Sequence, residues 1–192
     1  MKRSMQLVVG ALIVSALQIG FLFSVIQGRA TILRDGAEVM LKVEPVDPRD
    51  LLRGDYVRLG YEISSVPRTL FEPPLADADA AKGTPVLVRL APGDDGLWRP
   101  VGARLAETQA SAMPDGQVEI AGTIDTAFAA IDQVRLSYGI ERFYLPEGEG
   151  REIERDMRER PFMILAAIGE GGTAQIKAFF DGKTRLYEEP LY

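Results

Sequence analysis

Side chains able to do chemistry are concentrated between Glu44 and Ile63, where the sequence reads EPVDPRDLLRGDYVRLGYEI. Asp47-Pro48 indicates a turn, because proline fixes φ at the second turn position. The interleaved arginines and aspartates that follow form either a solvated corner with weak ion pairs or a preorganised recognition surface. The recognition hypothesis places these residues in a binding surface: Asp47, Arg49, Asp50, Arg53, Gly54, Asp55, Tyr56, Leu59 and Tyr61.

A second stretch with aromatic and charged side chains reads YGIERFYLPEG and begins at Tyr138. In a strand, successive side chains point to opposite faces, so Glu141 and Arg142 would face opposite ways. Oxygen ligands for Ca²⁺ or Mg²⁺ could come from Glu147 and Glu149 together with Asp47, Asp50 or Asp55, but the spacing matches no metal-binding loop. We therefore predict no metal and no cofactor. The residues of this stretch that we assign to the same binding surface are Tyr138, Glu141, Arg142, Tyr144 and Glu147.

The composition removes several classes of chemistry. The chain has no cysteine and no histidine, which excludes disulfides, thiol nucleophiles, Ser-His-Asp triads and the usual zinc sites. Its 22 basic and 28 acidic side chains give a net charge of −6, and residues 31–192 alone carry −9. An acidic exterior disfavours nucleic acid as a partner, since binding to phosphates needs clustered positive charge.

The N-terminal segment has the composition of a membrane span. Between Leu7 and Ile26, thirteen of the twenty residues are Leu, Ile, Val or Phe. Twenty helical residues extend about 30 Å, the thickness of a bilayer's hydrocarbon core. Lys2 and Arg3 precede the run, so the positive-inside rule places the N-terminus in the cytoplasm. We expect an uncleaved signal-anchor over residues 1–30, inserted in lipid through residues 5–27, and an extracytoplasmic domain over residues 31–192.

A cleaved signal peptide is the alternative for this segment. The apolar run is longer than the 7 to 15 residues typical of a signal-peptide core. The nearest small-residue site, Gly28-Arg29-Ala30, also contains an arginine. Both features favour an anchor that stays attached.

Small residues repeat every four positions within the span, at Ala16, Gly20 and Ser24. Such a stripe lets a second helix approach closely, and Gln18 could hydrogen-bond across that same contact. Small residues are also common in membrane helices that make no such contact. The packing hypothesis predicts a partner helix at the stripe, and the alternative predicts none.

Alternation of apolar and polar residues dominates the rest of the chain and predicts many short strands with Gly/Pro turns. We expect a mostly β fold, a curved antiparallel sheet or open barrel, with one short helix at 150–160 and a long surface loop at 66–83. The C-terminal residues fit either a terminal strand or an extended tail. The predicted strands lie at 39–43, 56–63, 85–91, 98–105, 117–124, 134–138, 162–168 and 174–180, with a hairpin loop at 169–172.

Residues 54–61, GDYVRLGY, fit the pattern GDYXXLXY at every fixed position, and the chain thereby resembles the GDYXXLXY-motif family. The approach to the motif over residues 47–53 and the segment 138–148 also look like that family. The resemblance implies a bacterial inner-membrane protein with one span and a periplasmic domain. It also implies association with a multi-spanning membrane protein, but no established activity.

Two classes of function fit these observations. A single anchor, an outer β domain and a Gly-Asp pair loosely resemble type I signal peptidases, but those enzymes need a serine nucleophile beside a lysine base. Aligning the Gly-Asp pairs puts Val46 or Asp47 at the serine position, and Glu141 stands where the lysine is needed. We therefore predict a membrane-anchored accessory or binding module rather than an enzyme. The alternative is a membrane-anchored hydrolase with a signal-peptidase-like β fold that lacks the Ser/Lys dyad.

Overall fold

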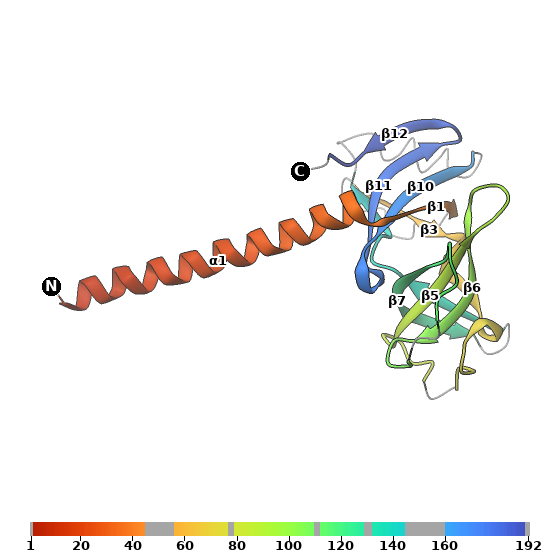
Figure 1. Ribbon diagram of the computed structural model, residues 1–192, viewed down its shortest axis with the longest axis horizontal. Coiled ribbons are helices and arrows are strands. Elements are labelled where there is room, and N and C mark those ends of the chain that lie inside the picture. Colours follow the sequence, from red (N-terminus) through yellow and green to blue (C-terminus); the bar gives the residue numbers. More distant parts are fainter. Residues whose placement is uncertain are drawn as a thin grey trace.

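The protein consists of one long helix joined to a β domain (Figure 1). The computed structural model describes residues 2–44, 56–76, 79–109, 112–128, 132–144 and 160–190. The helix is α1 (Lys2–Asp35). The strands are β1 (Ala37–Glu44), β2 (Tyr56–Arg58), β3 (Gly60–Tyr61), β4 (Ser65–Pro67), β5 (Pro85–Pro92), β6 (Trp98–Leu105), β7 (Val118–Phe128), β8 (Gln133–Ser137), β9 (Arg142–Tyr144), β10 (Phe162–Ile168), β11 (Ala174–Asp181) and β12 (Thr184–Glu188). Three short 3₁₀ turns are η1 (Glu62–Ser64), η2 (Arg68–Leu70) and η4 (Glu170–Gly172).

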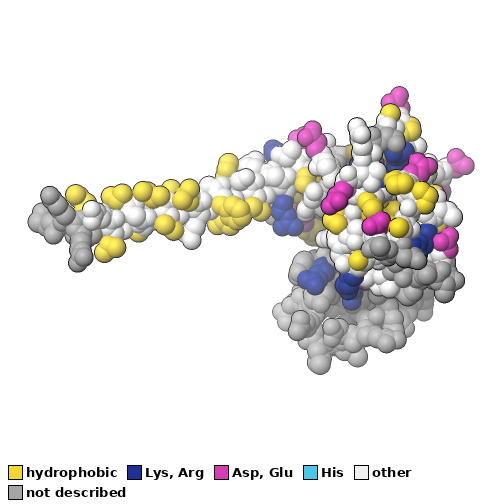
Figure 2. Space-filling view, turned by 90° about the horizontal axis from the view of Figure 1, so that it is seen from below, with side chains coloured by type: hydrophobic (Ala, Val, Ile, Leu, Met, Phe, Trp, Pro, Cys, Tyr) yellow, Lys and Arg dark blue, Asp and Glu magenta, His cyan; other side chains and the backbone are white. Residues whose placement is uncertain are grey.

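Helix α1 is long and apolar enough to cross a membrane, a property that signal sequences share. Its 34 residues correspond to a length of about 51 Å at 1.5 Å per residue. Apolar side chains cover its free length, and basic side chains lie near its base (Figure 2). A helix that is apolar all round is typical of a membrane span, because no polar face remains for water.

The first sheet is antiparallel, with strand order β12-β11-β10-β1-β3. Strands β10 and β11 form the predicted hairpin, whose loop contains η4. The chain's last segment pairs with β11 as strand β12, so the terminal-strand interpretation is correct within the described residues.

The second sheet has the order β4-β8-β7-β5-β6 and curls into a nearly closed barrel. A bridge between Phe71 and Ala103 of β6 brings the segment after β4 against the other edge of the sheet. The backbone N–H of Glu72 donates to the Ala103 carbonyl at 2.8 Å, which strengthens this closure. The prediction of a mostly β fold with an open barrel is confirmed.

One hydrophobic core extends through both five-stranded sheets and the two-stranded β2–β9 ribbon. It is filled by the apolar positions of the alternating pattern, such as Val39, Leu41 and Val43 on β1. Burial of these side chains is the main favourable contribution to folding. The strand predictions from alternation are therefore confirmed for β1, β5, β6, β7, β8, β10 and β11.

Two sequence predictions are wrong in detail. The strand predicted at 56–63 breaks at Leu59, because β2 pairs with β9 whereas β3 pairs with β1, and the chain then enters η1. The predicted surface loop at 66–83 instead carries β4, η2 and the closing bridge, and it buries Val66, Phe71 and Leu75. Alternation cannot detect a strand that changes partners. The helix predicted at 150–160 lies almost wholly outside the described residues.

The base of α1 is packed firmly on the domain. Ala30 and Leu33 are buried, and the helix contacts β10 and β11. Gly169 lies so close that a Cβ there would meet the Ile32 Cγ1 atom at 2.7 Å. Gly36 joins the helix to β1, and its N–H donates to the Ile32 carbonyl at 2.9 Å. The domain therefore continues directly from the helix.

Gly36→Ala is expected to destabilise this junction. A Cβ at Gly36 would lie 2.4 Å from the Ile32 carbonyl oxygen and 3.0 Å from that of Ile168, and both are backbone atoms. We expect a loss of about 1–3 kcal/mol in the free energy of unfolding, measured by urea unfolding of the full chain in detergent micelles. The matched control is Gly28→Ala in the same helix, where a Cβ meets nothing within 4 Å. An equal effect of both variants would contradict the junction's tight packing.

Candidate functional site

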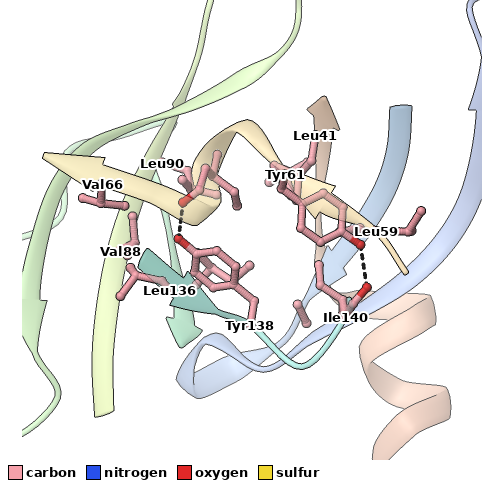
Figure 3. Packing of buried hydrophobic residues seen from close by; sticks show 14 of the residues in the cluster. Leu41, Leu59, Tyr61, Val66, Val88, Leu90, Leu136, Tyr138 and Ile140 are labelled. Carbon is pink, nitrogen blue, oxygen red and sulfur yellow. Dashed lines mark hydrogen bonds between the residues drawn. The ribbon is translucent and has the colours of Figure 1, made fainter. Parts of the chain in front are cut away.

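Two buried tyrosines connect the two signature segments reciprocally. The Tyr61 hydroxyl donates to the Ile140 carbonyl at 2.5 Å, and the Tyr138 hydroxyl donates to the Ile63 carbonyl at 2.6 Å. Figure 3 shows both rings inside the apolar core. Each segment thus supplies one hydroxyl donor and one carbonyl acceptor to the other. Buried polar groups need such partners, because an unpaired one costs about 1–3 kcal/mol.

Glu141 holds the turn at the start of the second segment, between β8 and β9. Its carboxylate accepts hydrogen bonds from the backbone N–H groups of Tyr138 and Gly139, the latter at 2.9 Å. Gly139 has φ +80°, a left-handed conformation that favours glycine. The carbonyl of Glu141 accepts the Leu59 N–H at 2.9 Å. Burial raises the pKa of Tyr61 and Tyr138 well above the ordinary value, and the negative charge of Glu141 adds to the rise.

These contacts place several residues of the predicted binding surface inside the fold. Leu59, Tyr61 and Tyr138 are core residues, and Glu141 is engaged by backbone donors. Arg142, by contrast, is exposed on β9, and its neighbour Phe143 is buried. Tyr56 and Tyr144 are register partners in the β2–β9 ribbon, but their side chains lie outside the description. The other predicted residues, Asp47, Arg49, Asp50, Arg53, Gly54, Asp55 and Glu147, lie outside the described residues.

A groove of about 430 Å³ opens beside this core, and we call it the motif groove. Arg58 of β2 and Arg135 of β8 are exposed along it, and Ser64 and Ser137 contribute hydroxyls. Its acidic groups include Asp125, which pairs with Lys82 at 2.9 Å. The full lining consists of Glu44, Arg58, Leu59, Gly60, Tyr61, Ser64, Asp125, Arg135, Leu136, Ser137 and Glu141.

The motif groove offers hydrogen-bond donors and acceptors of both charges. Among the described residues, no group of three or more acidic side chains is placed to hold a metal ion. The arrangement suits recognition of a ligand that itself carries both donors and acceptors, such as a polypeptide segment. Sequence patterns alone did not select Arg135, Ser64 or Ser137. Ser64 lies just outside the motif, and Arg135 and Ser137 are distant from it in the chain. Only the folded structure places them along one groove with Arg58.

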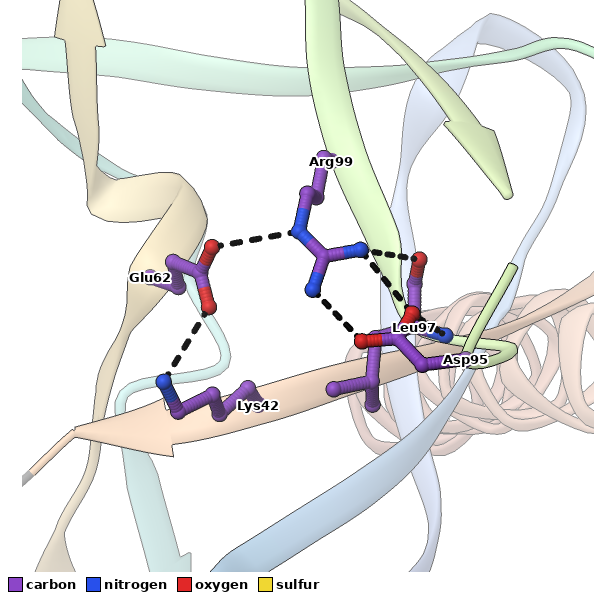
Figure 4. A network of polar contacts seen from close by, with 5 residues as sticks. All are labelled: Lys42, Glu62, Asp95, Leu97 and Arg99. Atoms are coloured by element: carbon purple, nitrogen blue, oxygen red, sulfur yellow. Dashed lines mark hydrogen bonds and ion pairs between the residues drawn. The ribbon is translucent and has the colours of Figure 1, made fainter. Parts of the chain in front are cut away.

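Next to the motif, Glu62 connects the two sheets at the surface (Figure 4). Its carboxylate contacts Lys42 of β1 and Arg99 of β6, each at 3.4 Å. Arg99 also makes a two-pronged pair with Asp95, at 2.9 and 2.6 Å, which lowers the pKa of Asp95 below its usual range. These groups are exposed to solvent, so we assign the network a positioning role rather than a large share of stability.

Removing the two tyrosine hydroxyls tests the reciprocal bonds. Tyr61→Phe and Tyr138→Phe should each lower the free energy of unfolding by about 1–3 kcal/mol, because a buried carbonyl loses its donor. Tyr187→Phe is the control, since its hydroxyl bonds to Glu189 in a half-buried position. Denaturant unfolding at pH 7 measures these effects, and a smaller loss for the buried pair than for the control would contradict the assignment.

The same tyrosines predict a dependence of stability on alkaline pH. Their pKa values are raised in the folded state, whereas unfolded tyrosines release protons near the ordinary value of 10.0. Stability is therefore fully present below pH 10 and falls as the pH rises above it, since only the unfolded chain ionises readily. The Tyr61→Phe/Tyr138→Phe double variant should lose stability less steeply above pH 10 in the same unfolding assay. Parallel slopes for the two proteins would contradict this prediction.

Comparison with known proteins matches the chain to one family. The family model described as GDYXXLXY protein matches residues 18–179, from the middle of α1 to β11. No curated protein and no solved structure matches the chain. Because the match includes the motif strand, the segment around Tyr138 and most of the β domain, the chain belongs to the GDYXXLXY protein family.

Proposed function

We propose that this protein is a membrane-anchored accessory module whose β domain binds an exposed loop of a multi-spanning membrane protein. The motif groove carries the proposal: it is lined by the motif residues from Arg58 to Tyr61 and lies on a domain that continues directly from α1. Groups of both charges line the groove, and they complement the mixed donors and acceptors of a polypeptide loop. The family's expected association with multi-spanning membrane proteins agrees with this choice of partner.

The free length of α1 offers two faces to neighbouring helices. At 100° per residue, Ala16, Gly20 and Ser24 form one narrow stripe, whereas Gln18 lies about 160° around the helix from Gly20. A Cβ at Gly20 meets nothing within 4 Å, so the stripe is open to approach. One partner helix cannot contact both the stripe and Gln18. The arrangement therefore suits a helix that lies between two helices of a larger membrane protein.

The orientation that we propose is single-pass, with the N-terminus in the cytoplasm and the β domain in the periplasm of a bacterium with an inner membrane. Lys2 and Arg3 support this orientation through the positive-inside rule. Alkaline phosphatase fused after Tyr192 should be active, because this enzyme folds only in an oxidising compartment. Green fluorescent protein fused at the same position should stay dark, because it does not become fluorescent when it is exported unfolded by the general export route. Membrane fractionation should retain both fusions, and activity in the released fraction would indicate cleavage of the helix instead.

Site-specific crosslinking tests the partner. A photo-crosslinking residue at Ser64, in the motif groove, should give one discrete adduct in intact cells, identified by mass spectrometry as a multi-spanning membrane protein. Arg135→Glu should reduce that adduct about tenfold or more, because it replaces a charged contact with a repulsive one. Gly20→Leu should reduce it as well, since a bulky side chain would block helix approach.

Matched controls keep this experiment interpretable. Arg185→Glu changes the same charge on β12, away from the motif groove, and should leave the adduct unchanged. A crosslinking residue at Met113, which is exposed outside the groove, should give no such adduct. If the Ser64 adduct persists in both Arg135→Glu and Gly20→Leu, the groove and the helix do not hold the partner.

A further inference from the structure

A second and larger groove lies where α1 meets the domain, with a volume of about 810 Å³. We call it the junction groove. Helix α1 forms one wall, from Ile26 through Arg29 to Leu33. The opposite wall comes from the segment around Ile140 and Phe143 and from strands β11 and β12, including Ile176. The lining of the groove thus combines apolar side chains with the charged groups of Arg29, Arg142 and Glu189.

The position of this groove along the helix is fixed by the packing at the base of α1. If Leu7–Ile26 fills the hydrocarbon core, Ile26 marks the edge of the acyl region. Ala30, the first helix residue buried against the domain, is four residues and therefore about 6 Å further along. The headgroup layer on each side of a bilayer is about 5–7 Å thick. The junction groove consequently opens into the layer of lipid headgroups.

The charges that line the groove complement a lipid that carries both signs. Arg29 and Arg142 are exposed on opposite walls of the groove, and guanidinium groups bind phosphodiester oxygens well. Glu189 also borders the groove; one carboxylate oxygen accepts the Tyr187 hydroxyl at 2.5 Å. A lining that holds a carboxylate as well as arginines favours a ligand with an ammonium group near its phosphate over one that is only anionic.

We infer that the junction groove binds one phospholipid with an amine-bearing, zwitterionic headgroup, phosphatidylethanolamine in chemical class. Arg29 receives the phosphate, Arg142 on the opposite wall adds positive charge, Glu189 receives the ammonium group, and the apolar side chains continue the acyl region past Ile26. This inference rests on the membrane anchoring in the proposed function, but it does not depend on the partner protein. Its consequence is that a lipid seals the space between the helix and the domain.

Native mass spectrometry of the full chain in detergent micelles tests this inference. The chain is titrated with phosphatidylethanolamine, phosphatidylglycerol and phosphatidylcholine that carry the same acyl chains. We expect one bound phosphatidylethanolamine at concentrations where the other two lipids bind about tenfold less. Arg29→Gln should reduce this adduct about tenfold, since a charged hydrogen bond is lost. Glu189→Gln should abolish the preference for phosphatidylethanolamine over phosphatidylglycerol.

Arg185→Gln is the matched control, because it removes the same charge from β12 outside the groove. Arg29 is exposed on the helix, so we expect Arg29→Gln to fold normally. It therefore tests the inference even if a second variant, Arg142→Gln, does not fold. Equal lipid retention in wild type and Arg29→Gln would overturn the inference. So would tight binding of soluble phosphoethanolamine alone, because the apolar wall would then contribute nothing. The Ser64 crosslink reports separately on the partner, so either proposal can fail without the other.

Discussion

The reciprocal hydrogen bonds of Tyr61 and Tyr138 constrain the rest of the domain. They join the segment that leaves β3 to the segment that leaves β8, and these belong to different sheets. Together with the Leu59–Glu141 backbone bond and the β2–β9 pairing, these two bonds of opposite direction fix the register of the two segments. Because both hydroxyls and both carbonyls are buried, neither bond can exchange with water at low cost. The motif groove lies directly beside this joint and takes its shape from it.

A second constraint is the unbroken path from α1 into β1. The turn at Gly36 follows the helix immediately, and both Ala30 and Leu33 are buried before the helix ends. A domain on a flexible linker would sample many heights above a membrane. In this protein one continuous helix connects the apolar segment to Ala30, the first buried helix residue. The distance between them is therefore fixed. Both grooves therefore belong to one body with the helix, so the lipid binding and the partner binding proposed above would share a common geometry.

Much of this architecture follows from the sequence, because alternation, turn residues and a long apolar run are local signals. They predict β1, β5, β6 and the β10–β11 hairpin, and the motif itself predicts the family. They do not predict that the strand at 56–63 changes partners at Leu59, or that Phe71 closes the barrel, since both depend on which distant strand lies alongside. The motif groove cannot be predicted from spacing either: Arg58 and Arg135 line it together although their strands, β2 and β8, belong to different sheets.

The structure also changes how the motif should be interpreted. A pattern of fixed residues such as GDYXXLXY is easily taken as a binding signature, yet its Leu59 and Tyr61 are buried, and Glu141 in the second signature holds backbone donors. Side chains with these tasks tolerate little change, because each replacement leaves a void or an unpaired polar atom in the core. Arg58 occupies a variable X position of the pattern and is exposed beside the groove. The fixed positions Leu59 and Tyr61 thus build the scaffold, whereas the variable position Arg58 lines the groove, where a binding role such as the one proposed above is open to change without loss of the core.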